Sequence, residues 1–118
     1  MKHEDLDVYK RSYKLALEIH EISFTLATNL QRDLGDQMRR ASRSVPSNIA
    51  EGCGRAKSEK DTINFLRTAL GSNDEMIFNL KFCHDAKLLD QNRISNLLAS
   101  YEITGKQLNK LIQSISSN

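Results

Sequence analysis

The chain has 118 residues, including 17 Lys or Arg, 15 Asp or Glu, two Cys, one Pro and no Trp. This length corresponds to one domain, residues 1–118, and allows an apolar core without disulfide bonds. An apolar fraction of 39% and a net charge of +2 exclude a disordered chain. No stretch approaches the roughly 20 apolar residues of a membrane span. The N-terminus lacks an apolar signal segment, so we expect a cytoplasmic protein with reduced thiols and no membrane partner.

Apolar residues recur every three or four positions, which predicts helices throughout. The first helix is expected over residues 5–27 with Asp5 as its N-cap, followed by a loop over residues 28–32. A second helix is expected from Asp33 to the glycines at 52 and 54, one of which would provide a left-handed C-cap.

Pro46 falls inside the second predicted helix. A proline there removes one backbone donor and clashes with the carbonyl of Ser42. The segment is therefore either a helix kinked at residues 42–46 or two short helices. Asn48 or an arginine could donate to the freed Ser42 carbonyl, and Asn48 and Glu51 share one face of the helix. We favour a structural role for the motif Pro46, Asn48, Glu51 and Gly52.

The third helix is expected to begin after Ser58, with Asp61 completing a capping box. It carries two apolar stripes, of which one would close the bundle and the other would face a neighbouring subunit. The second stripe comprises Phe65, Ala69, Met76 and Cys83. Gly71 and Ser72 would permit close approach, either at that contact or within the bundle.

Asp90 is expected to cap the fourth helix, in which Gly105 marks a close helix contact. The tail of residues 116–118 should fray. Short connections make neighbouring helices antiparallel. The predicted fold is thus an all-α, antiparallel up-down four-helix bundle with a proline-kinked second helix.

Signatures of enzymes and metal sites are weak in this sequence. It contains no CxxC, HxxxH or HExxH motif, and no Glu-x-x-His pair of the kind that holds metals in helical bundles. Cys83 and His84 are adjacent, so their side chains point in different directions on a helix, and we expect Cys83 to be a buried thiol. His20 is expected to be partly buried on the apolar side of the first helix. We therefore expect no catalytic residue, metal or cofactor.

Positive charge is concentrated in one segment. Residues 39–57 carry a net charge of +4, whereas the other 99 residues together carry −2. Arginine is well suited to bidentate phosphate contacts, so this segment is a candidate nucleic-acid-binding strip. Its basic residues are Arg39, Arg40, Arg43, Arg55 and Lys57. The alternative is a solvated helix face whose arginines pair with carboxylates such as Asp36 or with a neighbouring subunit. Aromatic residues are sparse in the segment, which disfavours a platform for stacked bases.

Residues 37–52 and Arg55, together with four short segments, carry a resemblance to a known family. These segments are 5–9, 65–66, 69–72 and residue 75. They resemble the bacterial four-helix-bundle proteins encoded in 23S rRNA intervening sequences. That family includes the accessory variability determinant of diversity-generating retroelements. The resemblance covers nearly the whole chain, although Tyr9 stands where Trp is common.

The resemblance implies a homo-oligomer, a ring-like homopentamer. It also implies RNA or DNA binding by Arg39, Arg40, Arg43 and Arg55 and, in the retroelement member, partnership with a reverse transcriptase. That member is basic, whereas this chain is nearly neutral. Our leading hypothesis is a non-enzymatic homo-oligomer that binds nucleic acid through the arginine strip. The alternative is a scaffold that docks a protein such as a reverse transcriptase, without contacting nucleic acid.

Overall fold

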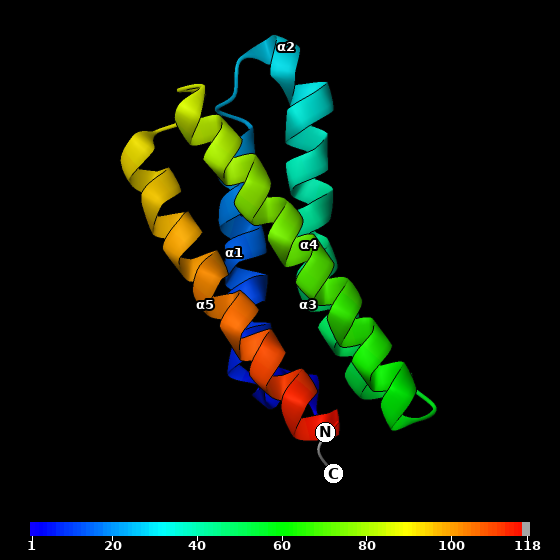
Figure 1. The fold of residues 1–118 in the computed structure, drawn as a ribbon. Helices are drawn as coiled ribbons and strands as arrows, with labels where there is room; N and C mark the ends of the chain where they lie inside the picture. Colours follow the sequence, from blue (N-terminus) through cyan, green and yellow to red (C-terminus); the bar gives the residue numbers. More distant parts are fainter. Residues whose placement is uncertain (117–118) are drawn as a thin grey trace.

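The computed structural model describes residues 1–116 and shows an all-helical bundle within them. Its four long helices are α1 (Asp7–Ser23), α3 (Asp36–Gly54), α4 (Glu59–Asp85) and α5 (Gln91–Ser116). A 3₁₀ turn, η1 (His3–Asp5), precedes α1, and a short helix, α2 (Thr28–Leu30), precedes the π-helical turn η2 (Gln31–Gly35). Successive long helices run antiparallel, so the start of α1 and the end of α5 lie at the same end of the bundle (Figure 1). The predicted bundle is thereby confirmed.

Two predicted caps are confirmed by hydrogen bonds. The hydroxyl of Ser58 accepts from the backbone N–H of Asp61 at 3.1 Å, and the carboxylate of Asp90 accepts from the N–H of Arg93 at 2.9 Å. The predicted cap at Asp5 is wrong, because this residue lies in η1 and Leu6 stands at the N-cap of α1. Each confirmed side chain satisfies an N–H group that the first helical turn leaves without a partner.

The connection between the first two long helices is more ordered than the predicted loop. The first helix ends at Ser23 rather than at residue 27, and α2 and η2 occupy residues 28–35. The side-chain amide of Gln31 donates to the carbonyls of Phe24 and Leu26, at 3.1 and 3.0 Å. These bonds satisfy carbonyls just after the end of α1. Leu26 is buried in the core, so the apolar pattern continues past the helix itself.

Helix α3 runs through Pro46 as one element, so the alternative of two short helices is excluded. Its glycines do not provide a left-handed cap, since none of the chain's glycines has a positive φ. Gly52 instead allows close approach to α4: a Cβ there would lie 3.1 Å from the Cβ of Phe65. The hydroxyl of Thr62 also donates to the Gly52 carbonyl at 3.1 Å. Gly52 is a packing residue.

Helix α4 packs against both α3 and α5, which explains its two apolar stripes. Ala69, Met76 and Cys83 of the second stripe are fully buried inside this chain, so these three residues pack within the bundle. Ser72 bonds within the bundle, where its hydroxyl donates to that of Ser44 at 2.8 Å, whereas Gly71 is exposed. The large apolar side chains that α4 does expose are Phe78 and Phe82, one helical turn apart.

A layer of small polar residues divides the interior into two apolar clusters. Each long helix contributes one buried residue that lies, along its sequence, between members of the two clusters. These residues are Ser12, Ser42, Asn73 and Thr104. Asn73 joins two helices by donating to the Tyr101 carbonyl at 2.9 Å, while the three hydroxyls bond carbonyls of their own helices. We refer to these four residues as the polar layer.

The turn between α4 and α5 contains Lys87 in the left-handed region, with φ of 57°. The N–H of Leu88 donates to the Cys83 carbonyl at 2.9 Å, and the N–H of Lys87 to the His84 carbonyl at 3.2 Å. These bonds close α4 in the manner of a Schellman motif. At the other end of α5, Ser116 is the last helical residue, and residues 117–118 of the tail predicted to fray lie outside the described part.

Candidate nucleic-acid interface

Arg39 lies at the centre of a structural clamp and not on a free basic strip. Its guanidinium donates to the Ser23 hydroxyl at 2.7 Å and to the Gln31 carbonyl at 2.9 Å, and it pairs with Asp36. Its Cζ also lies 4.4 Å from the ring centroid of Phe24. Only 11% of the side chain is exposed. The guanidinium thus fastens the end of α1 and the connection to α3, and pairing with Asp36, the alternative from the sequence, is confirmed for this arginine.

Arg40 and Arg43 are exposed on α3, and within residues 1–116 their side chains form no hydrogen bond or ion pair. Together with Arg39 they line a surface hollow of about 470 Å³, which we call the arginine hollow. Its other lining residues are Arg32, Asp33, Asp36 and Gln37. Arg32 comes from η2 and was not among the basic residues predicted from the sequence. Since Asp36 pairs with Arg39, three arginines remain here against Asp33.

Arg55 and Lys57 do not join the arginine hollow. Arg55 follows the last residue of α3, twelve residues beyond Arg43, which corresponds to about 18 Å along a helix. Lys57 precedes α4, and its backbone N–H donates to the Asp61 carboxylate at 3.2 Å. Both side chains are exposed. The five predicted basic residues therefore form two groups, one on the first half of α3 and the other in the connection between α3 and α4.

The motif around Pro46 is organised by Ser44. The amide of Asn48 donates to the carbonyl and the hydroxyl of Ser44, at 2.9 and 3.0 Å, and not to the carbonyl of Ser42, for which Asn48 was one of the two predicted donors. Since Ser72 also donates to the Ser44 hydroxyl, this network ties α3 to α4. The carbonyl of Glu51 accepts from the N–H of Arg55 at 2.8 Å. These contacts support the structural role expected for the motif.

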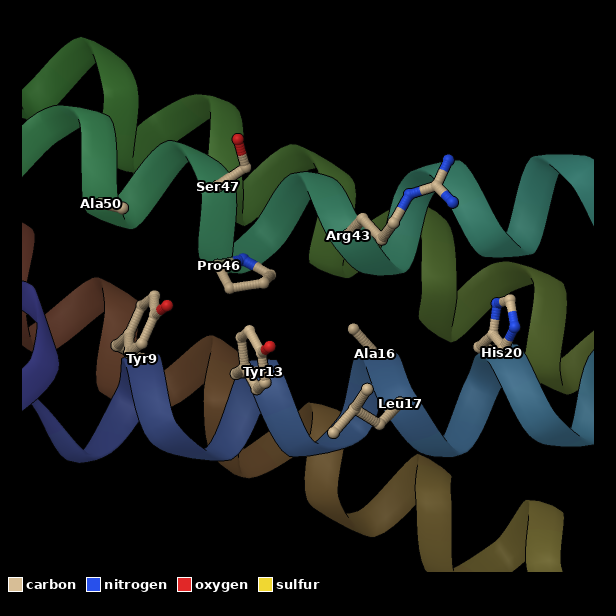
Figure 2. Close-up of a pocket in the computed structure, with 9 residues that line it drawn as sticks. All are labelled: Tyr9, Tyr13, Ala16, Leu17, His20, Arg43, Pro46, Ser47 and Ala50. Carbon is tan, nitrogen blue, oxygen red and sulfur yellow. The ribbon is translucent and has the colours of Figure 1, made fainter.

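An apolar groove lies between α1 and α3, beside the arginine hollow (Figure 2). It has a volume of about 510 Å³, and we call it the tyrosine groove. Tyr9, Tyr13, Ala16, Leu17 and His20 line it from α1, and Arg43, Pro46, Ser47 and Ala50 line it from α3. The sequence places aromatic residues far from Arg43 along the chain, and antiparallel packing of α1 on α3 brings them together.

His20 and the two cysteines have simple environments. His20 is exposed, contrary to prediction, and its ring lies edge-on to Phe24 with centroids 5.1 Å apart. Cys83 is fully buried, as predicted, and burial raises its pKa from 9.0 to about 11. Burial also raises the pKa of the half-buried Cys53. Both thiols are therefore protonated near neutral pH.

The described residues form neither a metal site nor a membrane span. Over residues 1–116, no three His, Cys, Asp or Glu side chains are grouped so that they could hold a metal ion. None of the helices in that range is both long and apolar enough to cross a membrane.

Comparisons with known proteins give one family and one fold. A family model described as 23S rRNA-intervening sequence protein matches residues 4–110. A crystal structure from Bacteroides thetaiotaomicron, of a protein with unknown function from the S23 ribosomal protein family, superposes with a TM-score of 0.83. It is 23% identical, and the match covers 96% of this chain and 99% of that one. No curated protein matches the chain. At this identity the likeness supports the fold.

Proposed function

Since the chain belongs to the 23S rRNA-intervening sequence protein family, we propose that it is a non-enzymatic, homo-oligomeric bundle that binds nucleic acid through the arginine hollow. The observation that carries the proposal is the pair Arg40 and Arg43. Both side chains are exposed, have no hydrogen-bond or ion-pair partner within residues 1–116, and line the same hollow as Arg32. Planar guanidinium groups make bidentate contacts with phosphates. The proposed ligand is the phosphate backbone of RNA or DNA.

The clamp at Arg39 supports this proposal in a specific way. It holds η2 against the start of α3, so Arg32 lies near Arg40 and Arg43 although it belongs to a different element. Arg39 is thus a positioning residue for the arginine hollow, whereas Arg32, Arg40 and Arg43 would contact phosphates. Arg55 and Lys57 would contribute only to a ligand long enough to follow α3 to its end.

The test is binding of structured RNA and duplex DNA by the full chain over a series of salt concentrations. If two phosphates are contacted, the double variant Arg40→Gln/Arg43→Gln should bind more weakly and lower the salt slope by roughly 1.4–1.8. The matched control is Arg67→Gln/Lys81→Gln, which removes the same charge from exposed positions on α4. Equal losses in both double variants would show only an effect of net charge and would contradict the assignment.

A second candidate function is a scaffold that docks protein, and two exposed phenylalanines favour it. Phe78 is 68% exposed and Phe82 is 52% exposed, and they lie one turn apart on α4. Such a ridge could bury itself against other copies of the chain, in a pentamer as the family resemblance implies, or against a protein such as a reverse transcriptase. The variant Phe78→Glu/Phe82→Glu should then have a lower mass by light scattering. An unchanged oligomeric mass would exclude the ridge from self-association.

A further inference from the structure

The tyrosine groove extends the arginine hollow, and we propose that it receives an unpaired base of the nucleic acid whose phosphates the arginines bind. This inference rests on the proposed function and names its ligand class, which is single-stranded rather than fully paired nucleic acid. A paired base is enclosed in its own stack, whereas an unpaired base can be turned outward onto a protein surface.

The walls of the tyrosine groove have the flat apolar character that a base requires. Tyr9 and Tyr13 lie one turn apart on α1, with ring centroids 5.9 Å apart and an angle of 35° between their planes. Tyr13 is 51% exposed, so its ring is accessible from solvent. The ring of Pro46 faces the tyrosines from α3 (Figure 2). Stacking on aromatic faces is the main source of affinity for single-stranded nucleic acids, and it tolerates any base.

Arg43 joins the two surfaces, because it lines both the tyrosine groove and the arginine hollow. Figure 2 shows its side chain leaving α3 with the guanidinium pointing away from α1. A nucleotide carries a flat apolar base and an anionic phosphate on one sugar. A base in the groove would therefore place its phosphate on the side of Arg43 that faces Arg40.

The charge and size of the groove also fit this occupant. None of the nine lining side chains is acidic, and Arg43 is the cation among them. The hydroxyls of Tyr9, Tyr13 and Ser47 and the ring of His20 are available to hydrogen-bond the edge of a base. Its volume of about 510 Å³ lies in the usual range for small-molecule sites. An aliphatic chain would use the apolar wall but would leave Arg43 without a counter-charge.

The experiment compares three labelled oligomers that differ in their bases. They are a dT strand of ~12 nucleotides, an abasic strand of the same length and a blunt-ended, fully paired duplex, each titrated with the full chain at low salt. The dT strand should bind more tightly than the other two. Tyr13→Ala should weaken dT binding by on the order of tenfold or more and leave the abasic strand unaffected. Tyr13→Phe keeps the ring and should preserve dT binding. Ile103→Ala, which removes an exposed apolar side chain from α5, is the control.

The outcomes separate this inference from the function on which it rests. Equal, salt-dependent affinity for the dT and abasic strands would leave the arginine hollow in place and overturn the base site. A lack of binding to all three oligomers would overturn both. Tyrosine emission gives a readout that needs no variant, because the chain has three Tyr and no Trp. The dT strand should quench this emission, and quenching by the abasic strand to the same extent would contradict the base site.

Discussion

Gly105 of α5 lies directly against the amide of Asn73 on α4. A Cβ at position 105 would lie 3.2 Å from Asn73 Nδ2, the atom that donates to the Tyr101 carbonyl at 2.9 Å. Within the described polar layer, this bond from Asn73 to Tyr101 is the only one that crosses between helices. The absence of a side chain at Gly105 leaves the space that the Asn73 amide occupies. The contact predicted from the sequence at this glycine is confirmed.

Substitution of two glycines by alanine should have opposite effects on stability. Gly71→Ala should stabilise the protein by about 1 kcal/mol, because alanine is the better helix former and a Cβ there meets nothing within 4 Å. Gly105→Ala should destabilise it by about 1 kcal/mol, because displacing the buried Asn73 amide outweighs that gain. Urea unfolding measures both. In an Asn73→Ala background, Gly105→Ala should become neutral or stabilising, and persistent destabilisation would refute the proposed contact.

Loss of the Arg39 clamp should reduce stability far more than loss of its neighbour. Arg39→Gln removes an ion pair and hydrogen bonds to two elements, so we expect a decrease of about 2–3 kcal/mol in the free energy of unfolding. Arg40→Gln, at an exposed position, should change it by less than about 0.5 kcal/mol. Equal effects in urea unfolding would show that the clamp contributes nothing to the fold.

Stability should fall in alkaline solution because of Cys83. Its pKa is raised from 9.0 to about 11 in the folded protein, so the folded state holds this proton more tightly than the unfolded chain does. The stabilisation is complete below pH 9 and is lost as the pH rises toward 11. Burial raises the pKa of Tyr101 as well, which acts in the same direction. Cys83→Ala should show a smaller loss between these pH values, although it starts from lower stability. An identical slope in both proteins would exclude Cys83 as a cause.

The left-handed residue of the α4–α5 turn offers a stabilising substitution. Lys87 has φ of 57°, a conformation that costs an L-residue about 1 kcal/mol and costs glycine little. Lys87→Gly should therefore raise the melting temperature. The control Lys87→Ala keeps the same backbone penalty and should melt close to the original protein. If both variants melt alike, the backbone conformation is not what limits this turn.

The fold followed from the sequence because its apolar periodicity and polar caps act locally. Ser58 and Asp90 could be identified as N-caps from the sequence next to them alone, because each cap bonds within its own helix. The candidate site could be predicted only in part. Arg39 and Arg43 are four residues apart and so share one helix face in the sequence, yet in the structure Arg39 is mostly buried and Arg43 is exposed. Which arginine turns inward depends on Ser23 and Gln31, which are distant in sequence. The tyrosine groove could not be predicted for the same reason, as its two walls belong to separate helices.

The polar layer also determines how α4 and α5 align lengthwise. Leucine-rich faces alone would pack nearly as well after one helix slides by a turn along its neighbour. Such a slide would carry Asn73 away from the Tyr101 carbonyl and into an apolar cluster, leaving a buried amide unpaired at a cost of about 1–3 kcal/mol. One asparagine thereby selects a single register for α4 against α5.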